Sequence, residues 1–199
     1  YKKYRKVRVA SGKTGYDVAR EILDKNGLKE VLVLETEGEL TDHYDPSKKV
    51  VKLSTDIYHS STIASTSVAA HECGHAIQDK ENYSMLRLRA SLVPIVNLST
   101  KIGYVAILIG ILANSVKLFN IGILMEALML LFQLVTLPVE FNASSRALKK
   151  IEDYNLVSKD EKKGCRKMLT SAALTYVASV VTTLIQIFRL VLVSRSSRR

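Results

Sequence analysis

Two long apolar segments limit what this chain can fold into. They are LVPIVNLSTKIGYVAILIGILA at 92–113 and LFNIGILMEALMLLFQLVTLP at 118–138, and only the four residues NSVK lie between them. Each has the roughly 20 residues that a helix needs to cross the hydrocarbon core of a bilayer. The short connection predicts a helical hairpin that enters the membrane and returns to the same side. A third apolar segment, 171–193, is a further candidate for a membrane-spanning helix.

The second apolar segment carries one carboxylate, Glu126, near its middle. A carboxylate at that depth is costly in lipid and predicts a buried partner, a water-filled cavity or a protonated side chain. The alternative is that the apolar segments form the core of a soluble helical bundle. Their length and uniform composition favour membrane helices over that alternative.

The formal net charge is +10, and basic residues cluster at the two ends, in YKKYRKVR at 1–8 and SRSSRR at 194–199. A nucleic-acid surface would interleave cations with aromatic residues on one face, so no nucleic-acid partner is expected. Basic clusters beside apolar segments are typical of membrane flanks. The two cysteines, Cys73 and Cys165, form no CxxC pair and predict neither a disulfide framework nor a cysteine zinc site.

The polar first part of the chain predicts a small α+β unit. The segment 11–29 indicates a helix that Ser11 or Thr14 caps and that Gly27 ends. Residues 30–36 and 49–55 are typical of strands.

The remainder of this part predicts a turn and a second helix. DHYDPSKK at 42–49 has the composition of a turn, and a helix is expected over roughly 62–80. The strand KVVKLST at 49–55 is either an edge strand that binds an extended substrate or an ordinary internal strand.

The stretch VAAHECGHAIQ at 68–78 has the spacing of a zinc-peptidase motif. His71 and His75 stand four residues apart, which rotates a helical side chain by only about 40°. Both imidazoles therefore lie on one face and can bind one zinc ion. Glu72 lies beside them, where it can act as general base towards a water molecule. The alternative is two histidines that pack in the core of an ordinary helix.

A catalytic zinc ion needs a third protein ligand. The remaining histidines, His43 and His59, lie in a predicted turn and a predicted loop and repeat no helical ligand pattern. Glu140 is the better candidate, because it follows the hairpin and returns to the same side of the membrane as His75. Glu140 follows Pro138 and is expected near the start of an amphipathic helix. The alternative is therefore an ordinary carboxylate that the helix dipole stabilises.

Four motifs together carry a resemblance: LTDHYDP at 40–46, VAAHECGHAIQ at 68–78, LPVEFNASSRAL at 137–148 and AALTYVA at 172–178. The chain resembles the bacterial membrane-bound neutral zinc metallopeptidase family over nearly its whole length. The resemblance implies an α+β zincin-like catalytic unit combined with α-helical transmembrane segments.

The resemblance also implies residue roles. His71, His75 and Glu140 are expected to bind one zinc ion per chain, with Glu72 as the general base. Members of the family usually have a membrane helix before the first basic cluster, so the chain is expected to be a fragment.

More distantly, the chain is similar to the integral-membrane gluzincins related to heat-shock and prenyl-protein proteases. Two positions depart from these relatives. Position 142 is often Asp in the family and is Asn142 here, and the residue four after the glutamate is Asp in the wider group and Ser144 here. Either side chain can hydrogen-bond a zinc ligand and fix its orientation.

Stabilising an oxyanion usually needs a second donor besides the metal. Arg146, Tyr176 and His43 are the candidates. Arg146 can instead pair with a carboxylate, and Tyr176 can be an aromatic residue at the membrane interface.

The expected parts are a catalytic unit with the HExxH helix at 1–90, a transmembrane hairpin at 91–138, a helix with the third ligand at 139–168, and an apolar helix with a basic tail at 169–199. Basic residues flank the apolar segments on the side of the catalytic unit. The positive-inside rule then places that unit in the cytoplasm of a bacterial cell, in a multi-pass inner-membrane protein. If 171–193 spans fully, the basic tail lies outside and breaks the rule.

The sequence therefore predicts a membrane-embedded zinc metalloendopeptidase. Its expected partners are the lipid bilayer and a peptide or protein substrate, which can be a membrane protein. Two alternatives remain open: a catalytically weak or inactive metal-binding membrane scaffold protein, and a structural membrane protein without metal.

Overall fold

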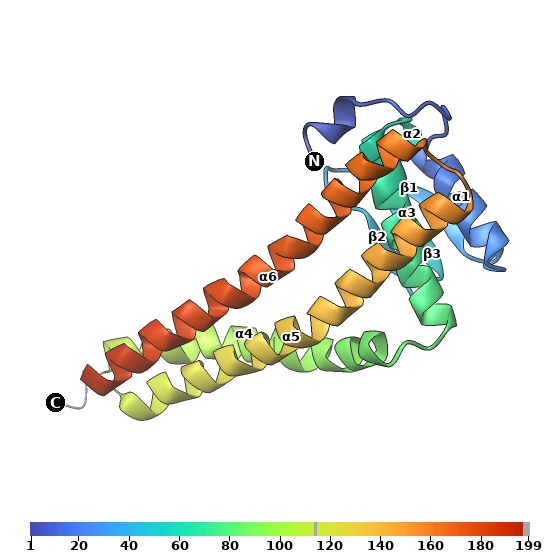
Figure 1. Cartoon of the computed structure of the whole chain (residues 1–199). Helices are drawn as coiled ribbons and strands as arrows, with labels where there is room; N and C mark the ends of the chain where they lie inside the picture. The colour runs from blue at the N-terminus through green and yellow to red at the C-terminus, as the bar shows by residue number, and fades with distance from the viewer. Residues whose placement is uncertain (114, 197–199) are drawn as a thin grey trace. The chain divides into compact units, whose positions relative to one another are not determined.

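The chain is rich in helices and has one small sheet (Figure 1). The computed structural model describes residues 1–113 and 115–196. The elements are η1 (Tyr4–Lys6), α1 (Gly15–Lys25), β1 (Leu32–Thr36), β2 (His43–Asp45), β3 (Val50–Ser54), α2 (Thr55–His59), α3 (Ile63–Lys80), α4 (Ser84–Leu112), α5 (Val116–Asp153) and α6 (Lys159–Ser196).

The contacts divide the chain into two compact units. Unit 1 comprises Tyr1–Tyr83 and Glu140–Ala173, and unit 2 comprises Ser84–Val139 and the part of α6 that begins at Leu174. Among the described residues, three helical stretches are long and apolar enough to cross a membrane: Ser84–Gly110, Val116–Asp153 and Lys159–Ser194. The expected combination of an α+β part with long apolar helices is confirmed.

Helix α1 is set by its two ends. The Thr14 hydroxyl accepts a hydrogen bond from the backbone N–H of Asp17, and the Asp17 carboxylate accepts one from the backbone N–H of Thr14. Thr14 is therefore the cap, while the Ser11 hydroxyl donates to the Leu156 carbonyl instead. Gly27 follows the helix with φ +67°, a conformation that favours glycine.

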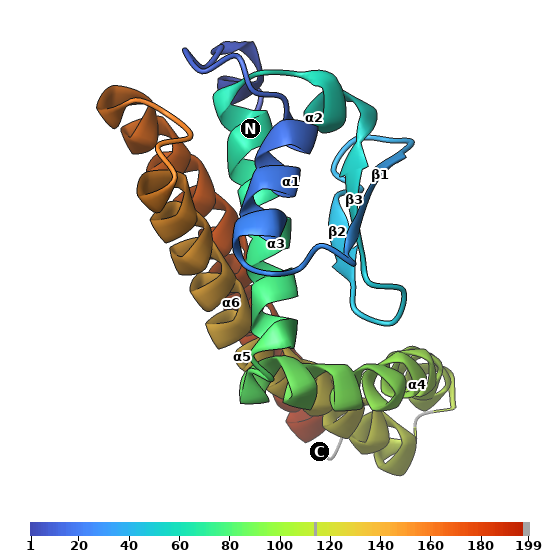
Figure 2. The same cartoon turned by 90° about the vertical axis from the view of Figure 1, so that its right-hand side faces the viewer.

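The sheet has the strand order β1-β3-β2, with β1 parallel and β2 antiparallel to β3. β3 is paired on both sides, which excludes the alternative that 49–55 is a free edge strand. Of its two readings, the internal strand is correct. Figure 2 shows α1 and α3 side by side on one face of this sheet.

The expected turn at 42–49 is only partly correct, because His43–Asp45 forms strand β2. Tyr44 stabilises this strand from the helix side, since its hydroxyl donates a 2.8 Å hydrogen bond to the Asp79 carboxylate on α3. Burial and the neighbouring Asp79 both raise the pKa of Tyr44. The turn follows the strand, and Lys49 has φ +51° there.

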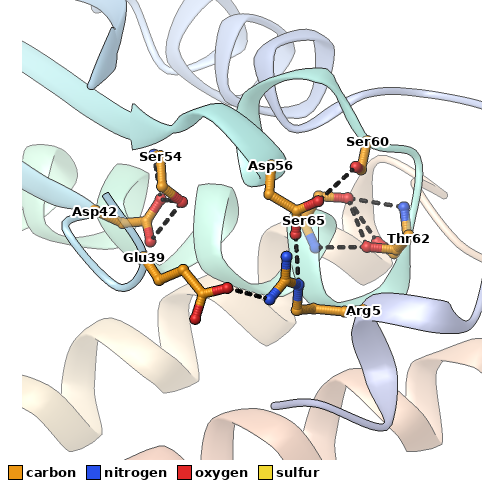
Figure 3. A network of polar contacts seen from close by, with 8 residues as sticks. All are labelled: Arg5, Glu39, Asp42, Ser54, Asp56, Ser60, Thr62 and Ser65. Carbon is orange, nitrogen blue, oxygen red and sulfur yellow. Dashed lines mark hydrogen bonds and ion pairs between the residues drawn. The ribbon is translucent and has the colours of Figure 1, made fainter. Parts of the chain in front are cut away.

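A polar network holds the segment that leads into α3 (Figure 3). Arg5 forms ion pairs with Glu39 at 2.6 Å and with Asp56 at 2.7 Å. Thr62 and Ser65 form the reciprocal capping box that begins α3. These contacts fix where the motif helix starts. His59, expected in a loop, is the last residue of the short helix α2.

Helices α3 and α5 approach closely at one glycine. A Cβ atom at Gly74 would lie 2.6 Å from the carbonyl oxygen of Ala143, so a larger side chain does not fit at this crossing. Cys73, the residue before Gly74 on α3, is fully buried and its Sγ lies 3.6 Å from the Ala19 carbonyl oxygen. Cys73 packs in the core, as expected.

Within unit 2, α4 and α5 form the predicted hairpin. A Cβ atom on Gly110 would lie 2.8 Å from the backbone nitrogen of Phe119, and one on Gly103 would lie 2.7 Å from the Cβ of Met125. Small residues allow such close approach between membrane helices. The predicted connection NSVK is shorter than expected, because α5 begins at Val116. Asn114 lies outside the described residues.

Helix α5 runs without interruption through Pro138. A helix that begins after Pro138 was expected, because proline removes a backbone donor and crowds the preceding turn. That expectation is wrong, and membrane helices are known to tolerate proline. Glu140 therefore lies far from a helix N-terminus, which removes the dipole explanation for its presence.

Two sequence expectations for the apolar helices stay predictions. Glu126 is half-buried on α5, and among residues 1–113 and 115–196 no hydrogen bond or ion pair engages its side chain. The full crossing of the membrane by 171–193 also stays a prediction. Residues 197–199 of the basic tail that follows it lie outside the described part.

Candidate metal centre

Three side chains from α3 and α5 converge in unit 1. His71 Nε2 lies 3.2 Å from Glu140 Oε2, and His75 Nε2 lies 3.6 Å from the same oxygen. One ligand atom from each residue lies within 4.8 Å of the other two. Glu140 is 2% exposed and His75 is 8% exposed, so the cluster is largely shielded from solvent.

These separations fit a zinc ion. Zinc binds histidine nitrogens and carboxylate oxygens at roughly 2.0–2.2 Å in tetrahedral geometry, which sets neighbouring ligand atoms about 3.3 Å apart. The two Nε2–Oε2 distances, 3.2 and 3.6 Å, lie close to that spacing. Two imidazoles and one carboxylate are also a ligand set typical of catalytic zinc.

The second nitrogen of each histidine also has a partner. His71 Nδ1 lies 3.3 Å from the Ser144 hydroxyl, and His75 Nδ1 lies 3.0 Å from Gln78 Oε1. When Nε2 binds a metal, Nδ1 keeps the proton and donates it to such an acceptor. Both rings are therefore oriented with Nε2 towards Glu140.

Gln78 is held in turn by a chain of polar contacts. Its Nε2 donates a 2.9 Å hydrogen bond to Asn142 Oδ1, and the same oxygen accepts a 2.6 Å hydrogen bond from Arg146 Nε. Arg146 Nη1 lies 2.7 Å from the Glu81 carboxylate. Asn142 therefore reaches His75 through Gln78, whereas Ser144 contacts His71 directly.

Sequence reasoning missed Gln78 and Glu81. The signal for Gln78 was available, since it follows His75 by three residues and a helix places such pairs on one face. Glu81 is the C-cap residue of α3 and carries no comparable signal.

Charge within the cluster favours a cation. Burial lowers the pKa of His75, but the hydrogen bond and the charge of Glu140, together with the charge of Glu72, outweigh burial and raise it overall. The site thus attracts a proton when it holds no metal.

Glu72 lies on α3 directly after the candidate ligand His71 and is 8% exposed. In the described part of the chain its carboxylate forms no hydrogen bond and no ion pair. Apart from its charge interaction with His75, this nearly buried carboxylate is available to accept a proton from a water molecule.

The three candidates for stabilising an oxyanion have different surroundings in the structure. Arg146 donates a hydrogen bond to Asn142 and forms an ion pair with Glu81. The alternative that Arg146 pairs with a carboxylate is therefore correct. His43 is exposed on β2, and its Nδ1 lies 2.7 Å from the Thr41 carbonyl oxygen. Tyr176 lies on α6 in unit 2 and is 37% exposed. A catalytic role for any of the three stays a prediction.

Together these features define a class: a helix-rich protein with apolar helices of membrane-spanning length and a candidate His-His-Glu metal centre. Residues 1–195 match the family described as "Putative neutral zinc metallopeptidase", and the chain belongs to this family. The expected family is thereby confirmed.

One curated relative is the "Putative membrane protease YugP" of Bacillus subtilis (strain 168). It is 44% identical to this chain over 198 residues, an alignment that covers 100% of this chain and 88% of the relative. No solved structure matches the chain.

Proposed function

We propose that this protein is a membrane-embedded zinc metalloendopeptidase with a zincin-like catalytic unit. The observation that carries the proposal is the convergence of His71 Nε2, His75 Nε2 and Glu140 Oε2 at the spacing of zinc ligands. The membership in a family described as zinc metallopeptidases, and the name of the Bacillus subtilis relative, support the same function.

In this proposal each residue has a distinct part in peptide hydrolysis. A zinc ion at the three ligands would polarise the scissile carbonyl and lower the pKa of a water molecule. Glu72 takes a proton from the attacking water at its carboxylate and then delivers it to the nitrogen of the leaving amine. Ser144 and Gln78 accept hydrogen bonds from the histidine Nδ1 atoms and keep both rings in place.

We further propose that the protein is a multi-pass protein of the bacterial inner membrane, with unit 1 on the cytoplasmic side. Arg87 and Arg89 precede the apolar part of α4, and Lys149 and Lys150 follow that of α5. A hairpin that crosses the membrane twice would leave these cations on the same side, which the positive-inside rule would assign to the cytoplasm. Substrates are then peptides or proteins that reach the membrane surface, membrane proteins among them.

The substitution Glu72→Gln tests the proposal. We expect the variant to keep its zinc, because Glu72 is not a ligand, and to lose cleavage of an unfolded casein-like or membrane-protein substrate. Glu37→Gln, in an exposed loop, is the matched control and should cleave at the wild-type rate. Undiminished cleavage by Glu72→Gln would exclude Glu72 as the base.

Two results with the wild-type protein would contradict the proposed activity. Stoichiometric zinc without cleavage of any substrate would favour the metal-binding scaffold. Failure to bind zinc would leave only a structural membrane protein.

A further inference from the structure

Helix α6 carries a row of cations beside its apolar part. Five basic side chains line one surface hollow: Lys159, Lys162, Lys163, Arg166 and Lys167. Their spacing of three and four residues places them on one side of the helix. Lys162 is paired with Glu152 and Lys163 with Asp160.

Three of these cations remain available to a ligand. No hydrogen bond or ion pair engages the side chains of Lys159, Arg166 and Lys167 within residues 1–113 and 115–196. Arg166 and Lys167 are exposed. Lys162 lowers the pKa of the Glu152 carboxyl that it binds, and Arg166 adds a smaller effect. The five cations still outnumber the carboxylates beside them, so the hollow presents excess positive charge to an anion.

The same side of α6 continues as an apolar surface. Lys163, Lys167, Thr170 and Leu174 follow one another at intervals of three or four residues, and Val181 and Phe188 follow at intervals of seven. This spacing places all six residues on the same side of the helix. Leu174 is 53% exposed, Val181 49% and Phe188 65%. A single helical face thus changes from cations to apolar side chains that no part of the described chain covers.

We propose that this face of α6 binds anionic phospholipids, with Arg166 and Lys167 on the headgroup phosphate. The apolar residues of the face would contact the acyl chains of the same lipids. An acidic protein segment would match the cations but not the exposed apolar surface that continues from them, and this observation favours a lipid.

Helix geometry limits which cations can take part. With a rise of 1.5 Å per residue, Lys167 lies about 6 Å, Lys163 about 12 Å and Lys159 about 18 Å along the helix from Ser171, where the apolar segment begins. The headgroup region extends only about 5–8 Å beyond the hydrocarbon core on each side. Arg166 and Lys167 therefore reach lipid phosphates, whereas Lys163 and Lys159 lie beyond them.

The test compares two lipids on the full chain. The purified protein in a neutral detergent is titrated with phosphatidylglycerol and, separately, with phosphatidylcholine of the same acyl chains, and bound lipids are counted by native mass spectrometry. We expect tighter binding of phosphatidylglycerol and no such site for phosphatidylcholine. A basic residue near a membrane surface contributes about fivefold in affinity, so the double variant Arg166→Gln/Lys167→Gln should bind phosphatidylglycerol about thirtyfold more weakly.

A control removes the same charge elsewhere. Lys29→Gln/Lys48→Gln also loses two exposed cations, neither of which lines the hollow, and it should bind phosphatidylglycerol like the wild type. Equal weakening in both double variants would show a diffuse charge effect and overturn the site. Equal binding of the two lipids, or displacement of phosphatidylglycerol by inorganic phosphate or an acidic peptide, would also overturn it. Zinc content measures folding in every variant, and the result does not depend on proteolysis.

Discussion

His71 Nε2 lies 3.2 Å from Glu140 Oε2 although 69 positions separate the two residues in the chain. The intervening sequence contains the whole apolar hairpin of α4 and α5. The two residues come together because α5 continues past the apolar segment into unit 1 and crosses α3 at Gly74.

The substitution Glu140→Gln should remove most zinc binding. The amide lacks the negative charge that a third zinc ligand supplies, so the loss should exceed the 10–100-fold that is typical when an orienting partner of a ligand is removed. Competition with a chromogenic chelator measures the affinity. Glu152→Gln, on the same helix but exposed, is the matched control and should bind zinc normally. Wild-type zinc affinity in Glu140→Gln would show that another group completes the site.

The approach of Glu140 to the histidines was predictable from the sequence, whereas the way it is held was not. The HExxH spacing defines one face of a helix, and a hairpin of two apolar segments returns the chain to the same side. Both arguments use only helical periodicity and the thickness of a bilayer. The contact between Gly74 and Ala143 depends on how two helices pack, which no local pattern encodes.

Two other features show the same limit of local sequence signals. The composition of segment 49–55 fits both an edge strand and a central strand of a sheet. Strand β3 is central because β1 and β2 pair with its two sides. Pro138 is a strong local signal for a helix boundary, but local signals yield to the apolar surroundings of a long helix. Local composition thus predicted the elements better than their ends or neighbours.

The substitution Gln78→Leu should weaken zinc binding about 10–100-fold, because His75 Nδ1 loses the acceptor that orients its ring. Leucine has a similar volume, so packing changes little. The same exchange at Gln133, whose buried Oε1 has no hydrogen-bond partner in the described part of the chain, provides the control. Gln133→Leu should leave zinc affinity unchanged. A similar affinity in the two variants would argue against Gln78 as a positioning residue.

The substitution Gly74→Ala should lower both stability and zinc affinity. The new Cβ would meet the Ala143 carbonyl oxygen at 2.6 Å and push α5 away from α3. Overpacking of this kind typically costs about 1–3 kcal/mol. Thermal unfolding and zinc titration measure the two effects.

Gly164→Ala is the control for this substitution. Its Cβ would lie 2.7 Å from Ile63 Cδ1, the end of a flexible side chain that can rotate away. This variant should keep its zinc affinity even if its melting temperature falls. If Gly74→Ala binds zinc as tightly as Gly164→Ala, the crossing does not set the ligand geometry.

Zinc should stabilise the protein more as the pH rises. Without metal, the pKa of His75 is raised above 6.5 mainly because Glu140 outweighs the effect of burial. The protonated histidine therefore stabilises the metal-free protein fully below about pH 6.5, and this contribution is lost as the pH rises through the folded-state pKa. Zinc requires neutral histidines, so its binding is opposed in the acidic range and favoured above it. The difference in melting temperature between zinc-loaded and chelator-treated protein should grow from about pH 6 to about pH 8.

His59→Gln, which changes an exposed histidine, should show the same trend, whereas His75→Gln should lose it. A difference that is constant across this pH range in the wild type would contradict zinc binding by His75.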